Sequence, residues 1–353
     1  MKTILLTGGA GFIGSHTAIT LIELGYRVII FDSFENSYPR VLEKIKYFFE
    51  RKSIDIQKRL IFFKGDIRNK NLLSLIFINA IKDNYRIDAV IHLAGLKSVS
   101  ESFILRKKYF DFNVNGARNL FCVMKEFDCT KIVFSSSASV YDASLESVFS
   151  EESPIKPSSP YGENKISIEK MLYENYLNED GYKWGIINLR YFNPVGAHPS
   201  GLIGEDPLGK PNNLFPYITQ VAINRKKILN IFGNDWPTKD GTAIRDYIHI
   251  MDIAKAHSQA LKHIFENEKI YLSLNIGSGI GTTVLDLVKL LEKVNKCYIP
   301  YRIKPRRMGD VPKLIAECSK AKNILGWHPQ YTLNDICKDA WNWILQNPQG
   351  YSE

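Results

Sequence analysis

The chain has 353 residues, of which 45% are apolar and 12% aromatic, and this composition predicts a globular protein of about two domains with a packed core. The formal net charge is +9, but basic and acidic residues are interspersed and the longest basic runs have three residues, so we expect no nucleic-acid partner. No apolar run approaches the ~20 residues that span a bilayer, so we expect no membrane span either.

The first residues and the cysteines bear on the location of the protein. Residues 1–7 carry one basic side chain and an apolar stretch that is shorter than the apolar region of a signal peptide, which predicts a cytoplasmic protein. The five cysteines show no Cys-x-x-Cys spacing and no paired histidines. We therefore expect reduced thiols, no disulfide framework and no metal site.

Strand and helix patterns alternate over the first 190 residues. Short apolar runs predict strands at residues 2–6, 27–31, 60–63, 87–93, 131–134 and 184–189. Helical periodicity covers residues 12–24, 69–83, 106–127 and 159–177, and Gly25 is the expected C-cap of the first helix. Apolar strands separated by long helices are typical of a parallel sheet covered on both faces. The predicted fold class is therefore α/β, a doubly wound, Rossmann-like parallel sheet with a smaller C-terminal α/β substrate domain.

Beyond residue 190 the pattern is less regular, and six prolines occur between residues 194 and 237. We assign residues 1–190 to a nucleotide-binding domain. Residues of about 240–276 are expected to return to this domain. Residues 191–353 are assigned mainly to a domain that binds the substrate over the ends of the strands.

A glycine-rich loop follows the first strand and opens the first helix. Gly8, Gly11 and Gly14 have the spacing G-x-x-G-x-x-G. Glycine lets the backbone approach a pyrophosphate closely, and the helix N-terminus offers oriented N–H groups. We expect Phe12 and Ile13 to flank this pyrophosphate through their backbone.

Three further strand ends fit the same dinucleotide groove. Asp32 ends the second strand, where a carboxylate can accept from both ribose hydroxyls and would repel a 2′-phosphate, so the predicted cofactor is NAD. Asp66 and Ile67 follow the third strand, and Asp66 can meet the adenine amino group. After the fourth strand, small Ala94 and Gly95 leave room for the cofactor.

Tyr161 and Lys165 lie four residues apart, downstream of a strand that ends in Ser135, Ser136 and Ser137. On a helix this spacing places the phenol and the ammonium on one face, and a nearby positive charge favours the phenolate. Such a phenol can act as a base near neutral pH. Together with the glycine loop, the pair predicts a redox active site.

These features resemble the extended short-chain dehydrogenase/reductase family. Longer blocks are similar to the UDP-glucose 4-epimerase family within it, in order along nearly the whole chain. The blocks are residues 94–97, 135–138, 190–199, 211–214, 231–235, 245–249 and 307–310.

The resemblance implies an isomerase that interconverts UDP-glucose and UDP-galactose through a transient 4-keto sugar with bound NAD. Inverting C4 breaks a bond to a carbon without an acidic proton, and oxidation to a ketone offers a route. Tyr161 is implied as the base that takes the O4 proton. Ser137 would hydrogen-bond O4, and Lys165 would hold the nicotinamide ribose and lower the tyrosine pKa.

The resemblance also implies the ligand contacts and a homodimer. Arg245 and Arg307 would neutralise the diphosphate of a UDP-sugar, a task suited to planar guanidinium groups. Asp310 would contact the uridine ribose. The implied cofactor-binding residues are Gly8, Gly11, Phe12, Ile13, Gly14, Asp32, Asn36, Ser37, Asp66, Ile67, Leu93, Ala94, Gly95, Lys97, Tyr161, Lys165 and Phe192. The implied substrate-binding residues are Lys97, Ser137, Asn193, Asn213, Leu214, Asn230, Ile231, Phe232, Arg245, Arg307, Asp310 and Leu314.

Three positions depart from the family pattern. Phe112 stands where asparagine is frequent, and Asp142 where glycine is usual. Leu314 stands where epimerases restricted to glucose and galactose carry tyrosine. A smaller side chain there leaves volume beside the sugar C2, which predicts activity on UDP-GlcNAc and UDP-GalNAc as well.

Other functions stay open at this stage. A sugar-nucleotide 4,6-dehydratase shares the fold and the tyrosine, but it needs carboxylates beside the strand-end hydroxyl, where Ala138, Ser139 and Val140 stand instead. A UDP-glucuronate decarboxylase needs a cationic contact for the sugar carboxylate, and the sequence does not place one. A non-catalytic NAD-binding protein can keep the glycine loop while losing the base, yet Ser137, Tyr161 and Lys165 are all present.

Overall fold

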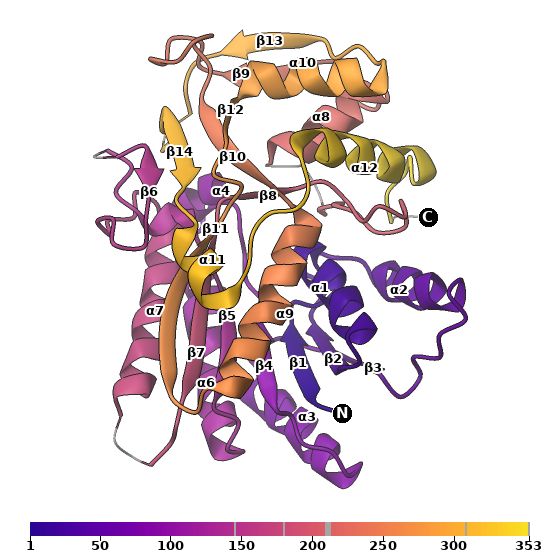
Figure 1. Cartoon of the computed structure of the whole chain (residues 1–353), viewed down its shortest axis with the longest axis vertical. Helices are drawn as coiled ribbons and strands as arrows, with labels where there is room; N and C mark the ends of the chain where they lie inside the picture. The colour runs from indigo at the N-terminus through magenta and orange to yellow at the C-terminus, as the bar shows by residue number, and fades with distance from the viewer. Residues whose placement is uncertain (145, 179–180, 209–212, 308, 352–353) are drawn as a thin grey trace.

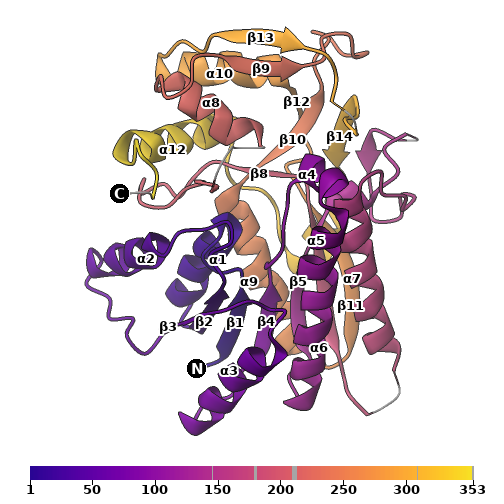
Figure 2. The ribbon, with the colours of Figure 1, turned by 180° about the vertical axis from the view of Figure 1, so that it is seen from behind.

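The structure is a computed structural model, and it describes residues 1–144, 146–178, 181–208, 213–307 and 309–351 (Figure 1). A large sheet with helices on both faces forms one layer of the molecule. The smaller C-terminal layer lies over one end of its strands, as the views from the front and from behind both show (Figure 2).

The large sheet is parallel throughout, and seven strands belong to it in the part of the chain that the structure describes. Their order is β3-β2-β1-β4-β5-β7-β11, so the chain moves to one side after β1 and to the other side from β4 onward. This confirms the doubly wound fold, and the strand order reverses between β1 and β4. The strands are β1 Thr3–Thr7, β2 Arg27–Asp32, β3 Leu60–Lys64, β4 Ala89–His92, β5 Lys131–Ser137, β7 Gly185–Tyr191 and β11 Ile270–Ile276.

The two faces of this sheet carry separate cores because successive side chains of a strand point to opposite faces. On β1, fully buried Ile4 and Leu6 join one cluster, and fully buried Leu5 joins the other. The first cluster includes helices α1 (Phe12–Glu23), α2 (Arg40–Glu50) and α9 (Ile250–Glu266). The second includes α3 (Lys70–Lys82), α6 (Gly116–Glu126) and α7 (Pro160–Leu177). The near-continuous apolar strands of the sequence are thus covered on both faces.

The helix predicted over residues 106–127 is interrupted. It consists of α5 (Arg106–Phe110), a π-helical turn η1 (Asp111–Asn115) and α6, and α4 (Val99–Ile104) precedes it. The π-helical turn carries Asn113, whose side chain accepts a hydrogen bond from the Leu96 N–H at 2.8 Å and donates one to the Leu96 oxygen at 3.0 Å. Such turns are frequent beside functional sites, and this one fixes the loop that follows β4.

In its described residues, the C-terminal layer combines two small sheets with the helices α8 (Leu214–Ala222), α10 (Val284–Asn295) and α12 (Leu333–Gln346). Its larger sheet has the order β12-β10-β14-β6, with β8 paired to β10, and its smaller sheet pairs β13 with β9. The strands are β6 Val148–Phe149, β8 Asn193–Val195, β9 Leu229–Phe232, β10 Ile244–His249, β12 Gly281–Thr283, β13 Tyr301–Lys304 and β14 Lys313–Ala316. Helices α8, α10 and α12 share one apolar core with β9 and β10.

The chain passes between the two layers more than once. Strand β11 belongs to the large sheet, and helix α9 packs against one face of that sheet. Strand β6, from the N-terminal half, pairs with β14 of the C-terminal layer. The short helix α11 (Ser319–Leu325) also packs against α9 and β11. The division into domains at residue 190 stays a prediction.

The described residues contain neither a candidate membrane span nor a candidate metal site. Among them, no helix combines the length and apolarity that a membrane crossing requires. Nor do three or more His, Cys, Asp or Glu side chains of these segments gather where they could hold a metal ion.

Candidate active site

A cavity of about 710 Å³ lies between the carboxyl ends of the large sheet and the C-terminal layer. It is at the position where an open parallel sheet binds its ligands, beside the reversal of strand order. All residues that the sequence analysis assigned to the catalytic, cofactor-binding and substrate-binding sets line this one cavity. Segments as distant as the glycine loop and residues 309–314 therefore meet at a single site.

The glycine loop packs against the loop that follows β4. Gly8 has φ +72°, and a Cβ atom there would lie 2.6 Å from the backbone nitrogen of Ala94. A Cβ atom on Gly14 would lie 2.4 Å from the Gly8 oxygen. Helix α1 begins after Gly11, which provides no side-chain cap, so the first N–H groups of α1 are offered to the cavity. Close backbone packing and uncapped N–H groups fit a bound pyrophosphate.

Asp32 ends β2 at the wall of the cavity and is 8% exposed. Its carboxylate accepts hydrogen bonds from the Ala10 N–H at 3.0 Å, the Phe34 N–H at 2.9 Å and the Ser37 hydroxyl at 2.9 Å. A carboxylate has about four acceptor positions, so at least one remains for a ribose hydroxyl. The site therefore fits NAD, and its negative charge disfavours a 2′-phosphate.

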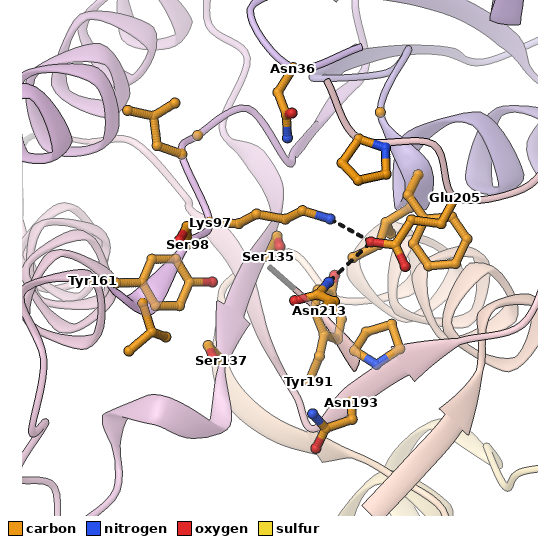
Figure 3. Close-up of a pocket in the computed structure, with 18 of the residues that line it drawn as sticks. Asn36, Lys97, Ser98, Ser135, Ser137, Tyr161, Tyr191, Asn193, Glu205 and Asn213 are labelled. Carbon is orange, nitrogen blue, oxygen red and sulfur yellow. Dashed lines mark hydrogen bonds and ion pairs between the residues drawn. The ribbon is translucent and has the colours of Figure 1, made fainter. Parts of the chain in front are cut away.

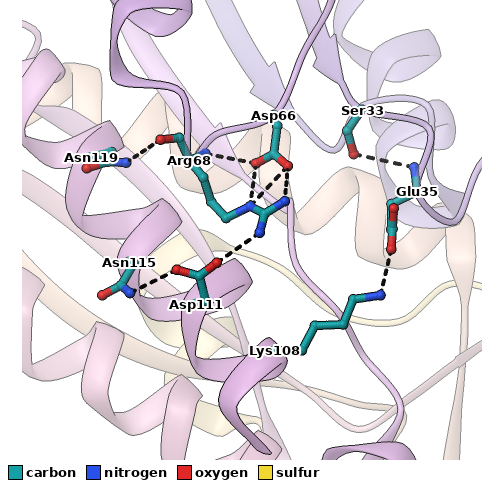
Figure 4. A network of polar contacts seen from close by, with 8 residues as sticks. All are labelled: Ser33, Glu35, Asp66, Arg68, Lys108, Asp111, Asn115 and Asn119. Atoms are coloured by element: carbon teal, nitrogen blue, oxygen red, sulfur yellow. Dashed lines mark hydrogen bonds and ion pairs between the residues drawn. The ribbon is translucent and has the colours of Figure 1, made fainter. Parts of the chain in front are cut away.

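The adenine end of the groove carries a polar network (Figure 4). Arg68 donates to Asp66 at 2.7 Å and to Asp111 at 2.8 Å, and its guanidinium lies 3.6 Å from the centre of the Phe112 ring. Lys108 of α5 pairs with Glu35 of the β2–α2 connection at 2.7 Å. The Asp66 carboxylate, predicted to meet an adenine amino group, is thus held by Arg68. Phe112 provides an apolar surface for the same arginine.

The predicted catalytic residues meet where β5 and α7 approach each other. Ser159 caps α7 by accepting from the Gly162 N–H, and Pro160 follows as a preformed first helical residue. This start places Tyr161 in the first turn and Lys165 one turn later. The Lys165 ammonium donates to the backbone oxygen of Ser135 at 2.5 Å.

Ser137 completes this group at the end of β5. It accepts hydrogen bonds from the N–H and the hydroxyl of Ser139, at 3.2 Å and 3.0 Å. Ser137 and Tyr161 both line the cavity, and their side chains face its interior (Figure 3). A sugar hydroxyl placed between them would contact an acceptor and a donor at once.

Burial dominates the protonation of the pair. It raises the pKa of Tyr161 to about 12, and hydrogen bonding with Ser137 opposes this rise. It also lowers the pKa of Lys165 to about 8, and the nearby Glu169 carboxylate opposes that fall. The lowered tyrosine pKa expected from the sequence is therefore wrong for the protein's own groups, because removal from water raises the pKa by more than the Ser137 hydrogen bond lowers it.

The opposite end of the cavity is basic. Arg245 on β10 lies 3.6 Å from Asp310, and Arg307 pairs with the same carboxylate at 3.0 Å. The side-chain oxygen of Asn193 is buried at the cavity wall without a hydrogen-bond partner among the described residues. Two arginines beside one carboxylate leave positive charge for a diphosphate, and an unpaired buried acceptor fits a bound hydroxyl donor.

The structure adds Glu205, which the sequence analysis missed. Its side chain is 7% exposed, and it accepts hydrogen bonds from Lys97 at 2.9 Å and from the amide nitrogen of Asn213 at 3.0 Å (Figure 3). Glu205 lies in the irregular segment between β8 and α8, where no strand end or motif marks it. Asp206 and Tyr217 were missed in the same way and also line the cavity. Ser135 and Tyr191 lie in family-like blocks but were not assigned to the site, and they line it as well.

The remaining departure from the family pattern lies outside this wall. Asp142 accepts hydrogen bonds from the N–H and the hydroxyl of Ser144, at 3.1 Å and 2.5 Å, and does not line the cavity. Its backbone is outside the positive-φ region that favours glycine. An aspartate is therefore accommodated here without backbone strain. Pro211, Asn212 and Met308 of the family-like blocks lie outside the described residues.

Comparisons with known proteins agree with this geometry. The family model described as GDP-mannose 4,6 dehydratase matches residues 5–340. The bifunctional UDP-glucose 4-epimerase and UDP-xylose 4-epimerase 3 of Arabidopsis thaliana is 44% identical over 100% of this chain and 98% of its own length. The UDP-glucose 4-epimerase of Bifidobacterium longum, solved with NAD+ and UDP, has a TM-score of 0.91 and 41% identity over 99% of this chain and 100% of its own. The UDP-Glc/GlcNAc 4-epimerase of Campylobacter jejuni has a TM-score of 0.80 and 32% identity over 98% and 100%.

Proposed function

The chain belongs to the UDP-glucose 4-epimerase family of extended short-chain dehydrogenases/reductases, and from this we propose that it interconverts UDP-glucose and UDP-galactose through a 4-keto sugar. The observation that carries the proposal is the single cavity. Its wall brings together the glycine loop, the group of Ser137, Tyr161 and Lys165, and the two arginines. One site thus has residues suited to bind a dinucleotide, a sugar hydroxyl and a diphosphate.

NAD, when bound, supplies the acceptor and the donor for the C4 hydride. The glycine loop and the start of α1 hold its pyrophosphate, and Asp32 holds a ribose hydroxyl. Lys165 fixes the position of the second ribose from beneath Tyr161. These residues orient the cofactor in a cavity that the C-terminal layer covers.

Tyr161 moves the O4 proton. Its pKa of about 12 means that the phenol is protonated at neutral pH, so it acts as a base only when positive charge at the site stabilises the phenolate. The Lys165 ammonium provides part of that charge. Ser137 hydrogen-bonds O4 and passes the proton between the sugar and the phenol.

Arg245 and Arg307 hold the diphosphate, and Asp310 keeps the two guanidinium groups in place. The side chain of Arg245 is 15% exposed and donates to the backbone oxygen of Val311 at 2.8 Å. This fixes the guanidinium before substrate arrives. Anchoring the UDP part leaves the sugar free to present either face of C4, which a 4-epimerase requires.

A second activity, on UDP-GlcNAc and UDP-GalNAc, is favoured by Leu314. This residue of β14 lines the cavity beside Arg245, its partner in the register of β10 and β14. It packs beside the cluster of Ala138, Tyr141 and Phe192 rather than filling the sugar site with an aromatic ring. A similar protein, from Campylobacter jejuni, is described as a UDP-Glc/GlcNAc 4-epimerase.

One assay tests both activities. The purified protein is incubated with UDP-galactose, UDP-glucose, UDP-GalNAc and UDP-GlcNAc, and the products are separated by chromatography. We expect epimerisation of all four. No turnover of UDP-galactose would overturn the main proposal, and no turnover of UDP-GalNAc would overturn only the second activity. Release of NAD from the denatured protein, without added cofactor, separates an epimerase that holds its cofactor from a protein that never bound it.

We also propose a cytoplasmic homodimer. Apolar side chains are exposed on the helices beside the active site, with Ile104 82%, Phe110 45%, Tyr173 46% and Leu177 53% exposed. All five cysteines are free thiols, which suits a reducing compartment. Light scattering tests the dimer, and fractionation of the source cells tests the location.

A further inference from the structure

Among its described residues, the cavity has one cation that is neither beside the catalytic tyrosine nor at the basic end. Lys97, Lys165, Arg245 and Arg307 are the lysines and arginines at its wall within the described segments. Lys165 is tied to the Ser135 oxygen beneath Tyr161, and the two arginines share Asp310 at the other end. Lys97 is therefore the cation available to the sugar itself.

Lys97 already forms an ion pair with Glu205. The two charged groups come from opposite sides of the cavity, with Lys97 on the loop after β4 and Glu205 on the segment between β8 and α8 (Figure 3). Their atoms are 2.9 Å apart, and the carboxylate is held a second time by Asn213. Because the Glu205 side chain is only 7% exposed, water screens its charge weakly on the protein side.

The Lys97–Glu205 pair and the catalytic group line the same cavity. Tyr161 and Ser137 lie on one side of the cavity interior, and Glu205 and Asn213 lie on the other (Figure 3). Lys97 and Glu205 line the same cavity as Tyr161, so substituents of a sugar whose O4 contacts Tyr161 can reach this pair. A neutral hydroxyl can donate to the carboxylate, whereas a carboxylate on the sugar would meet like charge and find Lys97 already paired.

We propose that Glu205 is a specificity-determining residue that restricts the enzyme to uncharged sugars and excludes UDP-linked uronic acids. The inference deepens the proposed function and rests on it. Glu205 acts in two ways, by repelling the C6 carboxylate of a uronic acid and by occupying the one lysine that could neutralise it. The Glu205 charge does not weaken the binding of neutral hexoses, because their sugar carries no charge for it to repel.

The test compares kcat/KM for UDP-galactose and for UDP-glucuronate, whose C4 can be inverted by the same chemistry. We expect the wild type to favour UDP-galactose by about 100-fold or more. Glu205→Gln keeps the size and one acceptor but removes the charge, and we expect it to raise the ratio of uronate to hexose activity by about 10-fold or more. Adding Lys97→Met to that variant should remove the gain, since the freed ammonium is what binds the uronate.

Glu35→Gln is the matched control because Glu35 also lines the cavity but pairs with Lys108 at the adenine end. Its ratio of activities should equal that of the wild type. An unchanged ratio in Glu205→Gln would overturn the inference. So would a wild-type inhibition constant for UDP-glucuronate within tenfold of the KM for UDP-galactose, a measurement that does not depend on how the variant folds. Absence of any turnover of UDP-galactose by the wild type would instead overturn the proposed function.

Discussion

The Lys165 ammonium lies 5.6 Å from the centre of the Tyr161 ring, one turn further along α7. Lys165 is buried and Tyr161 is partly buried. Removal from water raises the pKa of the phenol and lowers that of the ammonium, so it disfavours both charged forms. Each charged form is therefore costly unless the other is present. We therefore expect that replacing either Tyr161 or Lys165 with a side chain of similar shape that cannot carry charge will impair the function of the pair.

Replacing Tyr161 with phenylalanine should remove the base and leave the binding residues in place. We expect Tyr161→Phe to lower kcat for UDP-galactose by about 10²- to 10⁴-fold, the range of a lost acid–base group. The NAD released on denaturation should match that of the wild type. Tyr173→Phe changes an exposed tyrosine of the same helix and should keep full activity. Activity of Tyr161→Phe within tenfold of wild type would refute the assignment.

Lys165 should also leave a signature in the pH dependence of stability. Its pKa is lowered from 10.5 to about 8 by burial, so between these values the unfolded chain binds more protons than the folded protein. The free energy of unfolding therefore rises with pH in that window. Between pH 7.5 and 9.5, the wild type should gain about 2 kcal/mol relative to Lys165→Met.

Urea unfolding of both proteins, freed of cofactor, measures this difference. Other titrating groups are common to the two proteins and cancel in the comparison. A difference that does not change with pH would show that Lys165 keeps its ordinary pKa.

The large sheet and the NAD groove could be predicted because they depend on local patterns. Apolar runs and glycine spacing are readable in a single segment, and parallel strands place their carboxyl ends at the same edge. Asp32 and Gly8 were assigned to the groove in this way, and both line the cavity. The strands of the C-terminal layer could not be predicted, since β6 has two residues and β8, β12 and β14 have three or four. Such strands are held by their partners rather than by their own composition.

Glu205 and the tyrosine pKa depend on contacts distant in sequence. Lys97 and Glu205 are 108 residues apart, and no spacing rule connects them. The pKa of Tyr161 depends on its removal from water, which the spacing to Lys165 does not reveal. The sequence thus predicts the reacting groups but not the electrostatics around them.

The buried ion pair between Arg190 of β7 and Glu169 of α7 should be essential for stability. The guanidinium contacts the carboxylate at 3.0 Å and 2.7 Å, and the two side chains are 7% and 5% exposed. Glu169→Ala would leave a buried charge unpaired, which costs about 3–5 kcal/mol. Because the pair fastens α7 to the sheet, the loss should also disturb Tyr161.

Glu174→Ala is the control for this substitution, since Glu174 is exposed on the same helix. Its free energy of unfolding should stay within about 0.5 kcal/mol of wild type. Urea unfolding of both variants gives the comparison. An equal effect of the two substitutions would mean that the buried pair contributes no more than an exposed glutamate.

The breadth of substrate specificity should depend on Leu314. A tyrosine at this position would extend from β14 into the cavity, beside Arg245, and reduce the volume for a C2 acetamido group. We expect Leu314→Tyr to lower the ratio of kcat/KM for UDP-GalNAc to that for UDP-galactose by about 10-fold or more, the scale on which pocket volume discriminates. Leu314→Met conserves volume and should leave the ratio unchanged. If both variants keep the wild-type ratio, residue 314 only packs against the neighbouring cluster, and specificity for N-acetylated sugars is set elsewhere in the cavity.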